Sequence, residues 1–328
     1  MKRIPNCEIT ECEKLGSGGF GIVFKATWRG QEVAVKKLIN GTEDALTGDL
    51  LKKFKQEVQM MTKLSSSQRL VRLIGVCLPP DPVCLVMELM NRGNLFNLLH
   101  SEENLTWMTR LQIGIDVGRA LEFLHSEKVI HRDVKSSNVM LDGQLRAKLG
   151  DFGISKVIHT ITTTVTKGKA FEGTPQWSAP ETFGLRPKFS FSTDVFSMGV
   201  VMWELRTRQI PYKGIDSDEI RFAVKSGERE EIPKECAKEF SGMIERCWKQ
   251  NPEERPTAKE VAETLEKQLK EEQERGWRTH SRTMEEKIEL LEGTESDLKK
   301  VTEAYERCPV QEKVNNHFNV AWNTHFNN

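Results

Sequence analysis

Short apolar runs separated by turn residues dominate the first ninety residues of the chain. The segment 9–37 contains β-branched runs and glycine-rich punctuation, which are typical of strands. Residues 49–64 carry apolar side chains at helical spacing, and two further apolar runs, 70–78 and 83–90, are separated by a proline-rich turn. This pattern predicts a small, mostly antiparallel sheet with one helix over residues 1–90.

The apolar spacing becomes helical in the next part of the chain. Thr106 can cap a long helix, and 194–205 has the dense apolar composition of a buried helix. Thr257 and Glu260 have the spacing of a capping box at the start of another helix. We therefore predict an α+β domain with two lobes, in which a larger, mostly helical lobe covers residues 91–270.

Residues 271–328 differ in character from the rest of the chain. Charged side chains dominate 271–307, Gly276 and Gly293 interrupt that stretch, and the end of the chain is rich in asparagine. We expect a charged C-terminal tail that is partly helical or disordered. A module for self-association or for binding a partner is the alternative for this tail.

Composition excludes several classes of protein. Lys and Arg together number 48, as do Asp and Glu, so no general attraction to nucleic acid or anionic lipid is expected. No apolar run approaches the length of a membrane span, and the first 13 residues are polar, unlike a signal peptide. The seven cysteines lack the paired spacing of zinc sites, so we expect reduced thiols in the cytoplasm or the nucleus.

A glycine-rich segment interrupts the first predicted strands. Glycines allow a tight turn over phosphates and offer N–H groups to them without clashes from Cβ atoms. A dinucleotide site uses a similar motif but needs a helix at the third glycine, whereas strand-like residues follow here. The residues expected to bind a nucleotide are Gly16, Ser17, Gly18, Gly19, Phe20, Gly21 and Val23.

Lys36 follows the apolar run 33–35 and would by itself be an ordinary surface charge. Glu57 lies on the predicted helix 49–64, where its carboxylate can hold the ammonium group of a lysine that binds phosphates. Lys37 is the alternative partner, but the register of the preceding strand favours Lys36.

The segment 131–138 contains groups suited to phosphoryl transfer. Asp133 supplies a carboxylate for an attacking hydroxyl, Lys135 supplies a cation two residues later, and Asn138 supplies a carbonyl ligand for Mg²⁺. Asp151 follows in an Asp-Phe-Gly sequence.

These motifs, followed by Ala-Pro-Glu at 179–181, occur in an order that resembles the eukaryotic protein kinases, and the match runs from about residue 15 to residue 256. The resemblance implies a bilobal kinase fold, ATP and Mg²⁺ as cofactors, and proteins as substrates. It implies that Lys36 holds the α- and β-phosphates, that Asp133 is the catalytic base, and that Lys135 steadies the γ-phosphate.

The same resemblance assigns Asn138 and Asp151 to the Mg²⁺ ions. It implies that Asp194 braces the backbone of the catalytic loop and that Glu181 pairs with Arg255. The residues implied at the adenine site are Val23, Ala34, Met87, Glu88, Met90 and Met140.

Two sets of residues bear on substrate specificity. Lys135 and Thr174 are typical of serine/threonine kinases, in which that threonine reaches the catalytic Asp and Lys, whereas Trp28 and the segment 176–181 resemble tyrosine kinases. The mixture resembles the tyrosine-kinase-like group, which includes the Raf, mixed-lineage and receptor-interacting kinases. We predict a serine/threonine kinase, with a dual-specificity kinase or an inactive scaffold as the alternatives.

Threonine is unusually frequent between residues 153 and 173. This segment is either an ordinary polar loop or an activation loop, in which a phosphate pairs with the arginine that precedes Asp133. We favour control by phosphorylation, by the chain itself or by an upstream kinase. The residues expected to take part are Arg132, Thr160, Thr162, Thr163, Thr164, Thr166 and Thr174.

Overall fold

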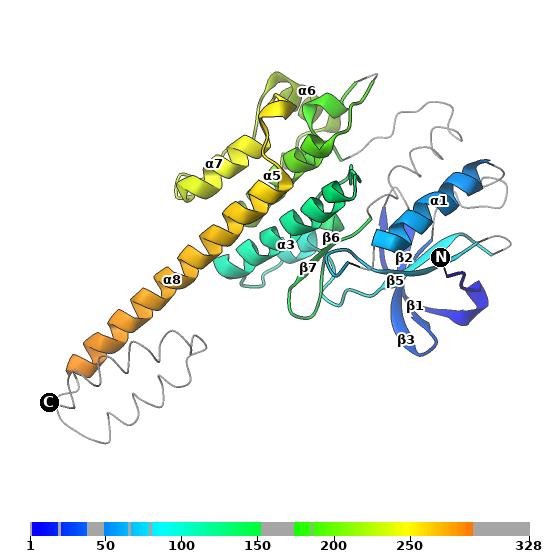
Figure 1. Cartoon of the computed structure of the whole chain (residues 1–328), viewed down its shortest axis with the longest axis horizontal. Helices are drawn as coiled ribbons and strands as arrows, with labels where there is room; N and C mark the ends of the chain where they lie inside the picture. Colours follow the sequence, from blue (N-terminus) through cyan, green and yellow to red (C-terminus); the bar gives the residue numbers. More distant parts are fainter. Residues whose placement is uncertain are drawn as a thin grey trace. The chain divides into compact units, whose positions relative to one another are not determined.

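The computed structural model describes residues 2–18, 21–37, 49–64, 67–78, 81–151, 174–184 and 186–290. The chain divides into two compact units, 1–268 and 269–328. The first unit contains a sheet lobe and a helical lobe, which confirms the predicted α+β class (Figure 1).

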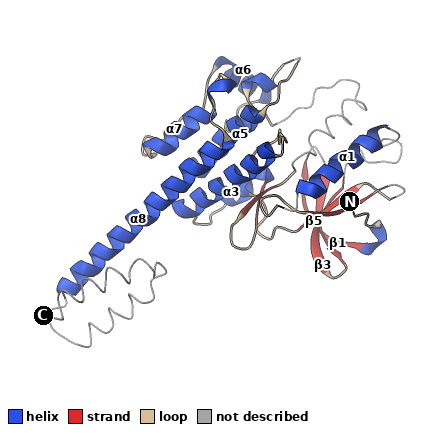
Figure 2. Ribbon diagram, viewed as in Figure 1, coloured by secondary structure: helices blue, strands red, loops and turns tan. Residues whose placement is uncertain are grey.

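The sheet lobe has five antiparallel strands in the order β1-β2-β3-β5-β4. Helix α1 lies on the sheet lobe (Figure 2) and contacts β4. All five strands and the helix fall where the apolar pattern predicted them. Their bounds are β1 Ile9–Gly18, β2 Gly21–Trp28, β3 Gln31–Lys37, α1 Asp49–Leu64, β4 Leu73–Cys77 and β5 Cys84–Glu88.

An N-terminal segment adds to the free edge of this sheet, which the sequence pattern did not predict. The amide of Ile4 donates to the carbonyl of Val76 over 2.8 Å, and the amide of Val76 donates to the carbonyl of Lys2 over 3.0 Å. Ile4 is only 1% exposed and packs with Trp28 in the apolar core of the sheet. The sheet edge at β4 is therefore covered by the chain's own first residues.

The helical lobe is built around α3 and α5, which contact each other. At Gly118 a Cβ atom would approach the Cβ of Ala262 within 3.1 Å, so α3 also packs closely on the first turns of α8. The elements of this lobe are α2 Leu95–Leu99, α3 Trp107–Ser126, β6 Val139–Leu141, β7 Ala147–Leu149, α5 Phe191–Thr207, α6 Ser217–Ser226, α7 Lys238–Cys247 and the first turns of α8 Ala258–Leu290, a helix that continues past residue 268.

Two helix starts follow the predicted caps. The side chain of Thr106 accepts a hydrogen bond from the amide of Thr109 at the start of α3. Thr257 and Glu260 exchange the two hydrogen bonds of a capping box before α8. Short polar side chains at these positions satisfy backbone donors that the first helical turn leaves unpaired.

Gly276, which interrupts the charged stretch of the sequence, does not interrupt a helix. Helix α8 continues without a break from Ala258 to Leu290. Glycine lowers helix stability by about 1 kcal/mol relative to alanine, but unlike proline it keeps its N–H group for the helical hydrogen bond. The predicted disorder of the remaining tail falls outside the described residues.

Candidate active site

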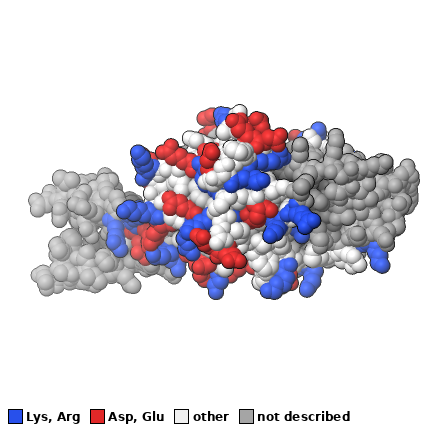
Figure 3. All heavy atoms as spheres, turned by 90° about the horizontal axis from the view of Figure 1, so that it is seen from above, with Lys and Arg blue, Asp and Glu red and all other residues white. Residues whose placement is uncertain are grey.

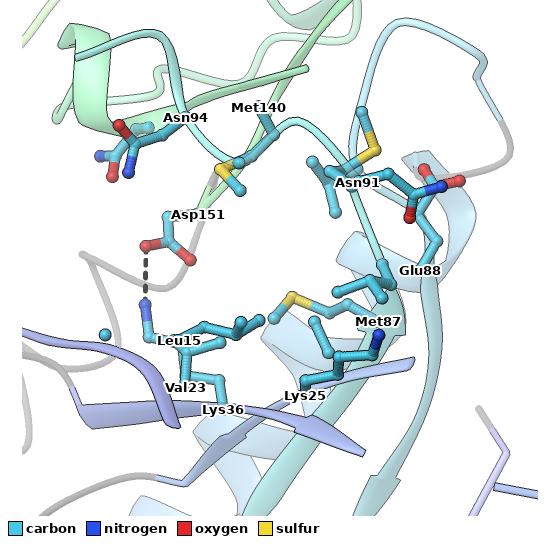
Figure 4. A pocket seen from close by; sticks show the side chains of 18 of the residues that line it. Leu15, Val23, Lys25, Lys36, Met87, Glu88, Asn91, Asn94, Met140 and Asp151 are labelled. Carbon is cyan, nitrogen blue, oxygen red and sulfur yellow. Dashed lines mark hydrogen bonds and ion pairs between the residues drawn. The ribbon is translucent and has the colours of Figure 1, made fainter. Parts of the chain in front are cut away.

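A cleft of about 500 Å³ lies between the sheet lobe and the helical lobe. Strands β2 and β3 contribute one wall and β6 the other, with Met87 between them (Figure 4). The predicted nucleotide-site residues that line it are Gly16, Val23, Ala34, Lys36, Met87, Glu88, Met90 and Met140. Ser17, Gly18 and Gly21 are outside this lining, and Gly19 and Phe20 lie outside the described residues.

The strand period explains which lysine enters the cleft. Side chains alternate between the two faces of a strand, and Val33 and Val35 belong to the buried apolar face of β3. Ala34 and Lys36 therefore face the cleft. Lys37 lies on the opposite face, where its ammonium group is 2.6 Å from Glu11. The register argument for Lys36 over Lys37 agrees with this geometry.

Lys36 and Asp151 meet across the cleft (Figure 4). The ammonium nitrogen of Lys36 is 2.6 Å from Oδ2 of Asp151, and the lysine side chain is only 5% exposed. Burial acts to raise the pKa of Asp151, but the charge and hydrogen bond of Lys36 outweigh it and hold that pKa below its usual value. The Glu57 side chain lies outside the described atoms, so its pairing with Lys36 stays a prediction.

Three of the predicted site residues, Asp133, Lys135 and Asn138, form one hydrogen-bonded cluster. The amide nitrogen of Asn138 donates to Oδ2 of Asp133 over 2.8 Å, and the ammonium nitrogen of Lys135 is 3.0 Å from the same oxygen. Lys135 also donates to the hydroxyl of Thr174 over 2.9 Å. The turn that contains Thr174 is thereby tied to the loop that contains Asp133.

Asp194 holds the backbone of the catalytic loop. Its two carboxylate oxygens accept hydrogen bonds from the amides of His131 (2.8 Å) and Arg132 (2.9 Å), and His125 lies 2.9 Å from one of them. Arg132 has a positive φ of 71°, which is an uncommon conformation for a residue with a side chain. The buried carboxylate therefore fixes a strained segment next to Asp133.

A second expected ion pair supports the helical lobe. The guanidinium group of Arg255 donates to both carboxylate oxygens of Glu181, over 2.6 and 2.9 Å. Such two-point contacts combine charge with fixed geometry. This pair anchors the segment that follows Thr174.

The side chains of Asn138 and Asp151 fit a magnesium site. Hard cations such as Mg²⁺ bind oxygen ligands. The amide nitrogen of Asn138 donates to the backbone oxygen and to Oδ2 of Asp133, which leaves the amide oxygen for a metal. The lowered pKa of Asp151 keeps its carboxylate ionised, as a metal ligand requires.

Sequence reasoning missed several residues of the cleft. Leu15, Asn91 and Asn97 also line it. Asn94 also lines the cleft and caps α2, because its side-chain oxygen accepts from the amide of Asn97 over 2.8 Å. A Gly-Asn pair before an apolar run is a helix-start signal that could have identified Asn94.

The predicted regulatory residues are only partly described. The guanidinium group of Arg132 lies 5.3 Å from the centre of the Phe189 ring, and among the described residues no carboxylate pairs with it. Thr174 belongs to the catalytic cluster. The other five threonines, between 160 and 166, lie outside the described residues, so their role stays a prediction.

The described surface and helices show no further feature at the site. On the face drawn in Figure 3, positive and negative side chains of the described residues are interspersed. None of the helices in the described ranges is long and apolar enough to cross a membrane.

Comparison with known proteins identifies the family. The family model for protein tyrosine and serine/threonine kinases matches residues 9–265. The probable serine/threonine-protein kinase drkD of Dictyostelium discoideum is 35% identical over 272 residues, which are 82% of this chain and 20% of drkD. Two kinases of Arabidopsis thaliana are also similar: the serine/threonine/tyrosine-protein kinase HT1 is 34% identical (77% of this chain, 65% of HT1), and the serine/threonine-protein kinase STY17 is 33% identical (79% of this chain, 44% of STY17).

The chain spans less than two thirds of the length of each of these relatives. The family match nevertheless covers most of the chain and includes both lobes and the cleft between them. The chain belongs to the family of protein tyrosine and serine/threonine kinases.

Proposed function

We propose that this protein is a serine/threonine kinase that transfers the γ-phosphate of ATP to hydroxyl groups of protein substrates. The observation that carries the proposal is the joint arrangement of two groups of residues that Asn138 connects: Lys36, Asn138 and Asp151 line the cleft, and Asn138 also contacts Asp133. Lys36 and Asp151 are 2.6 Å apart, and Asp133 is within hydrogen-bond reach of Asn138 and Lys135. Cations, metal ligands and a carboxylate for the acceptor hydroxyl are therefore close to one another.

Each residue has a definite chemical task in this proposal. Lys36 binds the phosphates of ATP, and Asp133 accepts the hydrogen bond of the acceptor hydroxyl and orients it. Lys135 is next to Asp133 and can neutralise charge on the transferred group. Mg²⁺, held by Asn138 and Asp151, supplies further neutralisation of the phosphate oxygens when it is bound.

Serine and threonine are the proposed acceptors. The hydrogen bond from Lys135 to Thr174 supports this, because it joins the catalytic loop to the turn beside which an acceptor would lie. The printed names of drkD and STY17 are those of serine/threonine kinases. The name of HT1 includes tyrosine as well, so dual specificity is the second candidate.

Mass spectrometry of the protein and of a generic substrate protein, after incubation with ATP and Mg²⁺, tests the proposal. We expect new phosphate on Ser and Thr and none with the Asp133→Asn variant. Phosphate on tyrosine as well would favour dual specificity. If the wild-type protein transfers no phosphate, the inactive scaffold becomes the better description.

We further propose that phosphorylation of threonine between residues 160 and 166 activates the enzyme. The exposed guanidinium group of Arg132 supports this proposal, since it lies beside Asp133 and has no acidic partner among the described residues. A phosphate carries nearly two negative charges at neutral pH and would pair with such a group.

A further inference from the structure

Glu204 carries a buried carboxyl group and lies outside the cluster formed by Asp133, Lys135, Asn138 and Thr174. It lies on α5 and has no exposed surface. One of its oxygens accepts a hydrogen bond from the hydroxyl of Ser136 over 2.6 Å. The other accepts from the indole nitrogen of Trp177 over 2.7 Å. Both oxygens are therefore used, and each is used by a different loop.

The two loops that meet at Glu204 contain the residues of the proposed chemistry. Ser136 directly follows Lys135 in the catalytic loop. Trp177 closes the turn that begins at Thr174, with its amide 3.3 Å from the carbonyl oxygen of Thr174. Lys135 and Thr174 join the same two loops through their 2.9 Å hydrogen bond. Glu204 thus forms the buried connection, and Lys135 forms the one beside Asp133.

We propose that Glu204 is a positioning residue that sets the distance between the catalytic loop and the turn that contains Thr174, so that an acceptor hydroxyl is aligned with Asp133. This inference rests on the proposed kinase function and adds to it the device that holds the acceptor side of the site. Glu204 touches neither nucleotide nor acceptor and acts only through Ser136 and Trp177.

The chemistry of the three groups suits a fixed connection. An indole N–H can only donate, whereas a serine hydroxyl can donate or accept. A carboxyl group satisfies both partners whether or not it carries a proton, and α5 is buried along almost the whole of its length from Thr193 to Leu205. Burial also raises the pKa of Glu204 to about 8, which favours the neutral form near pH 7. The connection is thereby anchored to a buried helix of the lobe.

Two tryptophans of this lobe allow a matched test. The indole of Trp177 donates to Glu204, and that of Trp203 donates to the carbonyl of Glu231 over 2.9 Å. Both rings are buried. Trp177→Phe and Trp203→Phe each remove one buried N–H hydrogen bond, but only the first one touches the proposed connection. A role confined to stability predicts similar losses of activity in the two variants.

Steady-state phosphorylation of a peptide is the readout, together with ATP hydrolysis and the rise in Tm caused by ATP. We expect Trp177→Phe to lower kcat/KM for the peptide about tenfold, the effect of one lost hydrogen bond at a positioned group. ATP hydrolysis and the Tm shift should change much less, because the nucleotide cleft is intact. Trp203→Phe should keep the wild-type ratio of peptide phosphorylation to ATP hydrolysis.

Variants of Glu204 and Ser136 complete the test. Glu204→Gln can still accept from Trp177 and donate to Ser136, so it should lose less peptide phosphorylation than Glu204→Leu. Ser136→Ala is the milder variant if Glu204→Leu does not fold, and it should lower the ratio of peptide phosphorylation to ATP hydrolysis. Equal ratios in all folded variants and in the wild type would overturn the inference. Absence of phosphate transfer by the wild type would instead overturn the proposed function.

Discussion

Glu204 should also make the stability of this protein depend on pH. Burial raises the pKa of its carboxyl group from 4.5 to about 8, and the hydrogen bonds from Ser136 and Trp177 offset only part of that effect. Because the pKa is higher in the folded state, the contribution to stability is fully present below pH 4.5 and is lost as the pH rises through 8. At about 1.4 kcal/mol per pKa unit, the total loss is about 5 kcal/mol.

The Glu204→Gln variant isolates this effect. Its amide has nearly the shape of the neutral acid and does not titrate, and all other ionisable groups are shared with the wild type. The difference in free energy of unfolding between the variant and the wild type, measured by denaturant titration, should shift in favour of the variant by about 1.4 kcal/mol per pH unit between the two pKa values. It should then level off.

A difference that stays constant over this pH range would refute the reasoning. It would mean that the folded protein binds and releases the proton of Glu204 much as the unfolded chain does. The carboxyl group would then be hydrated or paired with a cation, contrary to its complete burial and its two neutral partners.

Further variants test the rest of the site and the fold. Lys36→Met should lower phosphate transfer about a thousandfold or more while the Tm stays within a few degrees, as followed by kinetics and thermal melting. ATP with Mg²⁺ should raise the Tm, and Asp151→Ala should shrink the Mg²⁺-dependent part of that rise. Gly75→Ala should destabilise the protein by about 1–3 kcal/mol, because the added Cβ would lie 2.7 Å from the side chain of Ile4. Gly143→Ala is the control and should not destabilise it, because no atom lies within 4 Å of the added Cβ. Replacing the five threonines of 160–166 with alanine should lower activity on a protein substrate and leave the Tm nearly unchanged; full activity after preincubation with ATP would exclude loop phosphorylation as the switch.

The sequence by itself determined the elements whose signals are local. Alternating and helical apolar spacing located the strands of 9–37 and the helix 49–64, and Thr106 and Thr257 marked helix starts. The two-residue period of a strand also distinguished Lys36 from its neighbour. These signals are readable because each depends on residues within a few positions of one another, where backbone geometry fixes which side chains share a face.

The motif spacing predicted which residues belong to the catalytic cluster, but not how they contact one another. Lys36 and Asp151 are separated by 115 positions, and their 2.6 Å approach depends on how the two lobes pack. The side chain of the predicted partner Glu57 and the five threonines lie outside what the structure describes.

Only the tertiary structure decided the remaining features. Glu204 stands in an apolar helical run, where nothing local indicates that its partners are Ser136, 68 positions away, and Trp177. The polar N-terminus gave no sign that Ile4 completes the core of the sheet. In both cases burial is the reason. Burial removes a side chain from water, so the apolar Ile4 needs apolar neighbours and the polar Glu204 needs hydrogen-bond partners, and folding supplies both. Those neighbours come from distant parts of the chain, so a local sequence pattern cannot predict them.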